Sequence, residues 1–215
     1  MSTMSDAAIS AKRLPPEVKP IERCLDILIV FAVSAIAFFL ENLAIDAGWI
    51  PLASEVRGAI SVLAGASAAV WVVLARGGTL ADLGFRRPER WTIVPLQVFL
   101  VLIAFIAMQI LAPLLVSSII SLPEPDLSRY DSITGNLGGA VLMALVLPLT
   151  ASIPEEIIYR GFLIGRLSDI FGWNFSGVLI SVFNQAIIFG AIHFQWGIGG
   201  MIVTFMMGLV WGAAY

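Results

Sequence analysis

Two adjacent glutamates and an arginine stand out because they lie inside a long apolar stretch of the chain. Glu155 and Glu156 are followed by Arg160, and the residues around them are largely aliphatic or aromatic. An ionisable side chain in a membrane helix costs roughly 2.5–3.5 kcal/mol even on the mildest insertion scale, so such groups normally pair or face a cavity. These three side chains are therefore candidates for a functional site.

Helical geometry separates the two glutamates. Glu156 and Arg160 are four residues apart, so they share one helix face and can form an ion pair. Glu155 points about 100° away from Glu156 and remains available for chemistry. A carboxylate in a dry, apolar environment holds protons more strongly than in water, which suits a general base that activates a water molecule.

The chain has a single histidine, His193, in the segment Phe189 to Trp196. A turn is predicted at 172–174 (Gly-Trp-Asn); Glu155 precedes Trp173 by 18 residues and His193 follows it by 20. At 1.5 Å per residue, an antiparallel helical hairpin places both groups about 27–30 Å from the turn. Glu155 and His193 are therefore predicted to reach the same depth and to form one site.

Two amides accompany His193 on the same predicted helix. Gln185 is about 80° from His193 round the helix and is expected to line the same cavity, whereas Asn184 is about 180° away and is expected to contact a neighbouring helix.

Each of these features also has a purely structural interpretation. Ser152-x-x-Glu155 matches a capping box with Pro154 in the first turn, which would make Glu155 the cap of a helix starting at the membrane surface. Glu156 and Arg160 would then only hold a helix, His193 would be a hydrogen-bonded packing residue, and Phe189 would serve packing. Matched depth favours a site over these alternatives.

The elements that position these residues are apolar segments of membrane-spanning character. Of the 215 residues, 59% are hydrophobic and 13% are charged, and the excess gathers into long runs separated by short polar stretches. This composition is typical of an all-α, polytopic helical membrane protein. About six transmembrane helices are predicted, at 25–45, 58–75, 93–120, 137–171, 175–194 and 197–215. The net charge of −3 and the absence of a basic tract argue against a nucleic acid partner.

Basic residues predict the orientation of these helices. The N-terminal segment and the connection at 76–90 carry most of them: Lys12, Arg13, Lys19, Arg23, Arg76, Arg86, Arg87 and Arg90. The alternate connections have only Arg57 and Arg129. The positive-inside rule therefore predicts a cytosolic N-terminus, with a flexible cytosolic tail at 1–23 and a helical transmembrane domain at 24–215. The proposed site is expected to open toward the cytosol.

The motifs that these residues form resemble those of a known family. Glu155-Glu156-x-x-x-Arg160 followed by Phe189-x-x-x-His193 is similar to the EExxxR and FxxxH motifs of the CAAX protease and bacteriocin-processing family, also called the Abi family. The segment Leu83 to Pro88 resembles the loop before the family's core. The resemblance spans roughly 80–215, with the protease core at about 137–215.

Several properties are implied by this resemblance. Glu155 would be the catalytic base, with His193 helping to bind the water or a metal, and Glu156, Arg160 and Phe189 would support them. The family's eukaryotic members remove the last three residues of prenylated C-a-a-X proteins. The family also carries a later His/Asn motif, whereas this chain ends at Tyr215, so it is expected to be truncated relative to the family.

A divalent metal such as zinc is the cofactor to consider, with Glu155 and His193 as its ligands. A catalytic zinc usually takes three protein ligands, so the ligand set in this chain is incomplete. No other cofactor-binding residue is predicted.

The resulting hypothesis is a CAAX-type endopeptidase of a bacterial cell membrane that cleaves a membrane-associated protein or peptide with a Glu155-activated water. One alternative is a non-catalytic member of the same family that acts in bacteriocin immunity or as a binding or scaffold factor. Another is a transporter in which Glu155 carries a proton, although no internal repeat supports it.

Overall fold

The computed structural model describes residues 19–50, 57–119, 131 and 133–215, and this part of the chain is helical without strands. The main helices are α2 (Pro20–Asp46), α3 (Ala59–Ala75), α4 (Val94–Ile119), a long composite helix at 137–171, α8 (Phe175–Ala191) and α9 (Gly197–Ala214). The six predicted apolar segments are therefore all helical, and the fold is the expected all-α, polytopic membrane fold.

Length separates these helices into two groups. Four helical stretches are long and apolar enough to cross a membrane: Pro20–Asp46, Val94–Leu114, Leu137–Phe171 and Phe194–Ala214. The last of them combines the short 3₁₀ helix η6 (Phe194–Trp196) with α9. Helices α3 and α8 are equally apolar but have only 17 residues each. The chain is thus an integral membrane protein in which short helices pack beside long ones.

The composite helix departs from regular α geometry around the glutamates. It consists of α5 (Leu137–Leu147), the π-helical η4 (Pro148–Ser152), α6 (Ile153–Glu155), the π-helical η5 (Glu156–Ile164) and α7 (Gly165–Phe171). Pro148 and Pro154 lack the N–H that would bond to the carbonyl four residues earlier. The helix accommodates them with wider π turns, which are rare and occur frequently at functional sites.

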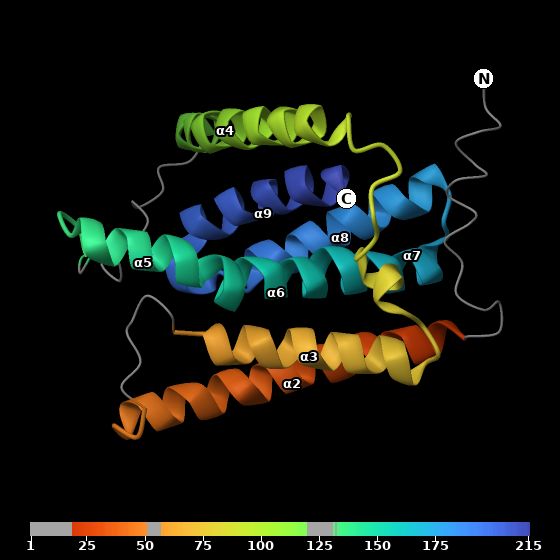
Figure 1. Ribbon diagram of the computed structural model, residues 1–215, viewed down its shortest axis with the longest axis horizontal. Helices are drawn as coiled ribbons and strands as arrows, with labels where there is room; N and C mark the ends of the chain where they lie inside the picture. Colours follow the sequence, from red (N-terminus) through yellow and green to blue (C-terminus); the bar gives the residue numbers. More distant parts are fainter. Residues whose placement is uncertain (1–18, 51–56, 120–130, 132) are drawn as a thin grey trace.

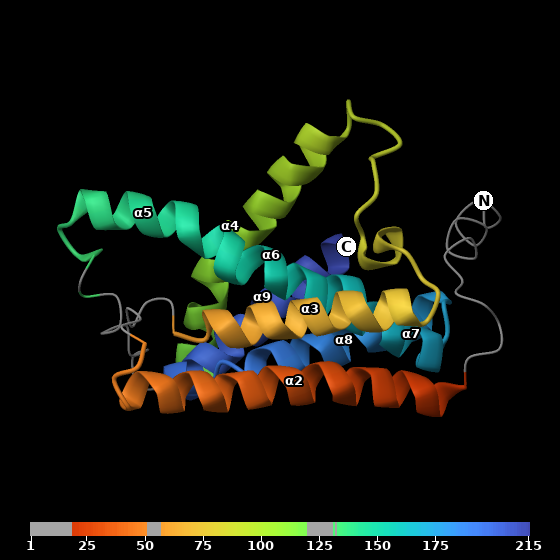
Figure 2. The same ribbon diagram turned by 60° about the horizontal axis from the view of Figure 1, so that its bottom comes forward.

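The helices form a bundle with two distinct ends (Figures 1 and 2). Helices α2 and α3 make an antiparallel hairpin on one side of the composite helix, and α8 and α9 make a second antiparallel pair, against which α4 packs. We call the right-hand end of Figure 1, where α2 starts, α3 ends and α7 meets α8, the Arg166 end. The opposite end, where α3 starts and α8 meets α9, is the Arg57 end.

A buried ion network holds the Arg166 end together. Asp26 on α2 binds Arg76 through Oδ1 at 2.9 Å and Arg166 through Oδ2 at 3.1 Å. Arg23 lies 3.4 Å from Asp26 and 2.8 Å from Asp169, which also accepts the Trp173 indole N–H at 2.8 Å. Helices α2, α3 and α7 are therefore joined by charges that are largely hidden from solvent.

This network corrects the predicted boundary of the N-terminal tail. The tail was predicted to extend to residue 23, but α2 begins at Pro20, which occupies the first helical turn. Arg23 is 2% exposed because the network recruits it into the helix. Residues 1–18 lie outside the described residues.

A carboxylate also fixes the Arg57 end of the α2–α3 hairpin. Glu41 is 2% exposed and accepts hydrogen bonds from the backbone N–H groups of Gly58, at 2.9 Å, and Ser61, at 3.3 Å. These N–H groups belong to the start of α3, where a negative charge is favoured by the helix dipole. Glu41 therefore caps a helix other than its own.

Two glycines allow the elements around the site to approach closely. A Cβ at Gly161 would lie 2.5 Å from the carbonyl oxygen of Leu83, so only glycine lets the 3₁₀ turn η2 (Leu80–Leu83) rest on the composite helix. A Cβ at Gly208 on α9 would lie 3.0 Å from the Cα of Ala186 on α8. Small residues thus set the spacing of these helices.

Candidate active site

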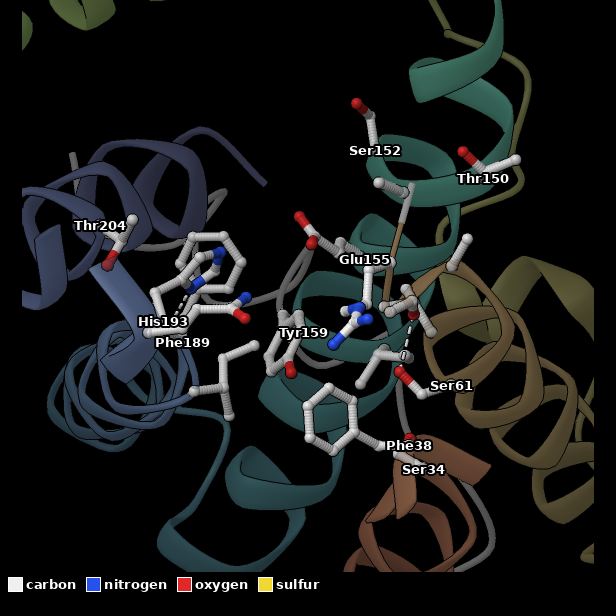
Figure 3. Close-up of a pocket in the computed structure, with 18 of the residues that line it drawn as sticks. Ser34, Phe38, Ser61, Thr150, Ser152, Glu155, Tyr159, Phe189, His193 and Thr204 are labelled. Atoms are coloured by element: carbon white, nitrogen blue, oxygen red, sulfur yellow. Dashed lines mark hydrogen bonds between the residues drawn. The ribbon is translucent and has the colours of Figure 1, made fainter. Parts of the chain in front are cut away.

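Glu155 and His193 line one cavity of about 490 Å³ inside the bundle. Helices α2 and α3, the composite helix, the α8–α9 connection and α9 all contribute to its wall. Figure 3 shows Glu155 on one side of this cavity and His193 on the other, with Tyr159 between them. The two groups that were predicted to share one depth thus face the same space.

Glu155 sits where the composite helix changes from α to π geometry. Its side chain is partly buried, and no hydrogen bond or ion pair reaches its carboxylate from the described residues. Its position in the middle of a 35-residue apolar helix contradicts the alternative in which Glu155 caps a helix at the membrane surface. Ser152 has helical angles (φ −59°, ψ −51°) and its side chain caps nothing, because the helix runs through it without interruption.

His193 lies just beyond the last turn of α8 and not within that helix, which ends at Ala191. Its ring Nδ1 is 2.7 Å from the carbonyl oxygen of Phe189. A carbonyl only accepts hydrogen bonds, so Nδ1 carries the proton that it donates, and Nε2 of the neutral ring is the acceptor. The ring centroid is also 4.8 Å from that of Phe189 and 4.7 Å from that of Trp196, so the imidazole is held on three sides.

Phe189 connects the two sequence motifs. The guanidinium carbon of Arg160 lies 4.5 Å from the centroid of the Phe189 ring, at cation–π distance. The Tyr159 ring centroid is 5.0 Å away in an edge-to-face arrangement. Phe189 therefore contacts Arg160, Tyr159 and His193 together, and its backbone carbonyl sets the tautomer of the imidazole.

Glu156 and Arg160 form the ion pair that their spacing predicted. Arg160 Nη1 lies 3.4 Å from Glu156 Oε1, with Arg160 almost fully buried and 51% of the Glu156 side chain exposed. Neither residue lines the cavity. The pair therefore lies behind the cavity wall, where it supports Phe189 through the Arg160 guanidinium.

Comparison with protein families agrees with this geometry. Residues 137–215, which comprise α5 to α9, match the family model described as Type II CAAX prenyl endopeptidase Rce1-like. We call residues 137–215 the matched segment. The search of curated proteins and the search of solved structures each gave no match.

The matched segment does not form the cavity alone. The α2–α3 hairpin, which precedes the matched residues, contributes Phe31, Ser34, Phe38, Ser61 and Val62 to the wall. The hydroxyl groups of Ser34, Ser61, Thr150, Ser152 and Thr204 are spread over this wall (Figure 3). The sequence pointed only to Ser152, and to that residue as a helix cap, because serine and threonine are common in apolar helices and no spacing links positions so far apart.

The two amides near His193 do not behave as their helical angles suggested. Gln185 is fully buried away from the cavity, and its Oε1 faces Gly212 on α9. The predicted angle of 80° assumed a helix continuing to His193, whereas α8 ends before it. Asn184 donates to the carbonyl oxygen of Ile180 in its own helix at 2.8 Å and does not bridge to a neighbour through that bond.

The donor set does not fit a catalytic zinc ion. Among the described residues, no group of three histidine, cysteine, aspartate or glutamate side chains could hold a metal ion. Glu155 and His193 are two donors, and a catalytic zinc normally takes three from the protein. The chemistry of the Glu155–His193 cavity is therefore considered below without a metal.

The cavity reaches the surface at the Arg57 end. Arg57 and Gly58 before α3, and Gln195 and Trp196 between α8 and α9, belong to its wall. The N-terminus of α2 lies at the opposite end of the bundle (Figure 1). With a cytosolic N-terminus, this surface opening would lie on the other side of the membrane, contrary to the predicted opening toward the cytosol.

Proposed function

We propose that this protein is an intramembrane endopeptidase in which Glu155 activates the hydrolytic water. The Glu155 carboxylate takes a proton from water as the oxygen adds to the carbonyl carbon of the substrate peptide bond. The C–N bond then breaks, and the same proton passes from Glu155 to the departing amine. The products are a carboxylic acid and an amine, which become a carboxylate and an ammonium ion when the acid gives up its proton, and Glu155 returns to its ionised form.

The observation that carries this proposal is the Glu155 carboxylate facing His193 across one cavity (Figure 3). A general base must be free to bind water, and Glu155 has no hydrogen bond or ion pair among the described residues. In contrast, the neighbouring Glu156 is committed to Arg160. The family match supports the reaction class, since the matched model is named for prenyl endopeptidases.

His193 has the second role, which is to orient the water. Because Nδ1 donates to the Phe189 carbonyl, Nε2 accepts a hydrogen bond from the water while Glu155 accepts the other. Phe189 and Arg160 are positioning residues, since Phe189 contacts the imidazole and Arg160 contacts the Phe189 ring.

The test is the substitution Glu155→Gln in the full-length protein reconstituted in vesicles. The probe is a membrane-anchored fluorogenic peptide, supplied once with a prenylated C-a-a-X terminus and once without it. Loss of a general base is expected to lower the cleavage rate by about 10²–10⁴-fold. Glu89→Gln is the matched control, because Glu89 is exposed in a connection away from the cavity, and it should cleave at the original rate.

Two outcomes would overturn the proposal. Cleavage by Glu155→Gln at the rate of the Glu89→Gln control would reject Glu155 as the base. A cellular phenotype that survives both Glu155→Gln and His193→Ala would favour the non-catalytic alternative, a binding or immunity protein built on the same helices.

A further inference from the structure

Lysine and arginine residues are distributed very unequally between the two ends of the bundle. Apart from Arg57 and the buried Arg160, every described lysine and arginine belongs to the start of α2, the connection from α3 to α4, or α7, and these segments lie at or toward the Arg166 end (Figure 1). The residues are Lys19, Arg23, Arg76, Arg86, Arg87, Arg90 and Arg166. Lys12 and Arg13 precede α2 in the sequence, and Arg129 lies between α4 and α5. Short connections rich in lysine and arginine stay in the cytosol during membrane insertion.

The cavity is closed toward this basic end. Ile158 and Tyr159 form its inner wall, and behind them a packed core of Val72, Val73, Leu83, Phe162 and Leu163 separates it from the ion network. None of the ionic residues Arg23, Asp26, Arg76, Arg166 and Asp169 lines the cavity. A substrate therefore has no route to Glu155 along the bundle axis from the Arg166 end.

The cavity wall continues instead to the Arg57 end. Arg57 and Gly58 belong to the connection before α3, and Gln195 and Trp196 to the connection before α9. Gln195 is exposed, and Arg57 is 41% exposed at its side chain. The connections between helices that line the entrance are thus the ones with the fewest basic residues.

We infer that the Glu155–His193 cavity opens on the extracytoplasmic side of the membrane and that the protein acts on peptide segments presented from that side. The statement about the substrate rests on the proposed function, whereas the side of the opening does not. The substrate class is a membrane-anchored peptide whose scissile bond lies in the extracytoplasmic half of the bilayer. Cytosolic C-terminal tails are on the wrong side of the core to reach Glu155.

Cysteine labelling tests the orientation without any activity assay. The chain has one cysteine, Cys24, so Cys24→Ser provides a cysteine-free background. Gln195→Cys then marks the cavity entrance, and Arg87→Cys marks the opposite end, both at exposed positions. Each variant is treated with a membrane-impermeant maleimide in sealed right-side-out vesicles, before and after permeabilisation.

The expected pattern is labelling of Gln195→Cys in sealed vesicles and of Arg87→Cys only after permeabilisation. The reverse pattern would overturn the inference, and so would equal labelling of both variants in sealed vesicles, because the protein would then lack a single orientation. Labelling of both in detergent solution confirms that each cysteine is accessible in the folded protein.

A pair of substrates separates this inference from the proposed function. Two single-span reporters carry the same peptide at the extracytoplasmic or at the cytosolic edge of their transmembrane helix. Cleavage of the first alone is expected, and it should disappear with Glu155→Gln. Cleavage of the second alone would overturn the inference while the proposed function stands. If the labelling pattern holds and neither reporter is cleaved, the proposed function fails and the orientation remains.

Discussion

The carboxylates of Asp26, at the Arg166 end, and of Glu155, in the cavity, differ in the groups that bind them. At the Arg166 end, the Asp26 carboxylate is 1% exposed and lies within 3.4 Å of nitrogen atoms from three arginines, which belong to α2, to the C-cap of α3 and to α7. In the cavity, the Glu155 carboxylate has no hydrogen bond or ion pair among the described residues. Both carboxylates lie in apolar helices, but only that of Asp26 is paired with basic side chains.

The difference indicates that the Asp26 carboxylate stabilises the fold and that the Glu155 carboxylate is available for chemistry. Removing a charge from water costs several kcal/mol per ion unless partners and hydrogen bonds compensate, and Asp26 has such partners. Glu155 keeps contact with a cavity instead, and a carboxylate left without a partner can bind water or substrate. Ionisable groups in a membrane helix are therefore best sorted by what binds them, because their position in the sequence does not distinguish the two cases.

The largest effect on stability is expected for Asp26→Asn. This substitution removes a buried carboxylate that Arg23, Arg76 and Arg166 all contact and leaves Asp169 as the remaining partner of Arg23 and Arg166, which should lower the free energy of unfolding by about 3–5 kcal/mol. The measurement is unfolding of the purified protein in detergent micelles. Asp46→Asn is the control, because its ion pair with Arg57 is long, at 3.6 Å, and exposed, and it should change little.

Glu155→Gln in the same unfolding assay sharpens the comparison. Functional groups often lower the stability of a fold. The free energy of unfolding of this variant should therefore lie within about 1 kcal/mol of that of the original protein, or above it. A loss of stability as large as that of Asp26→Asn would show that Glu155 is a structural charge, and the contrast drawn between Asp26 and Glu155 would be wrong.

Apolar periodicity alone predicted most of the helical architecture. The six runs correspond to helices whose ends differ from the predictions by a few residues, since a helix is the element that satisfies its own backbone in lipid. The length match around Trp173 also placed Glu155 and His193 on one cavity, because similar numbers of residues separate the two side chains from the turn.

The parts that escaped prediction depend on contacts between distant segments. The role of Glu41 becomes visible only when α3 is placed beside α2, since the N–H groups that it caps are 17 and 20 residues away. Ser34 and Thr204 reach the cavity from helices that no motif links to Glu155. The π turns and the early end of α8 are local, but they changed the angles on which the assignment of Gln185 depended.

A smaller loss of stability is expected for Glu41→Gln. The glutamine can still accept one hydrogen bond from the start of α3, but it loses the favourable interaction of a negative charge with the helix dipole. The free energy of unfolding should fall by about 0.5–2 kcal/mol, which is the range for helix caps. The same unfolding assay measures it, and Asn42→Asp, one residue along α2 and half-buried, tests whether charge alone at this end matters.

The loss of stability on Glu41→Gln should be smaller than the loss on Asp26→Asn and larger than the loss on Glu155→Gln. A loss equal to that of Asp26→Asn would mean that the hairpin, and not the ion network, dominates the stability of the bundle. No loss at all would mean that water replaces the cap.

The smallest effect on stability is expected for Glu156→Gln, which tests the division of labour between the adjacent glutamates. The ion pair with Arg160 is half-exposed on the Glu156 side and spans one helical turn, so its loss should cost about 0.3–0.5 kcal/mol. Arg160 keeps its place over the Phe189 ring, because that contact does not involve Glu156. Cleavage of the membrane-anchored peptide should therefore fall by no more than about tenfold, far less than with Glu155→Gln. If the two single substitutions abolish cleavage equally, the neighbouring carboxylates act as one unit, and the assignment of the base to Glu155 alone is wrong.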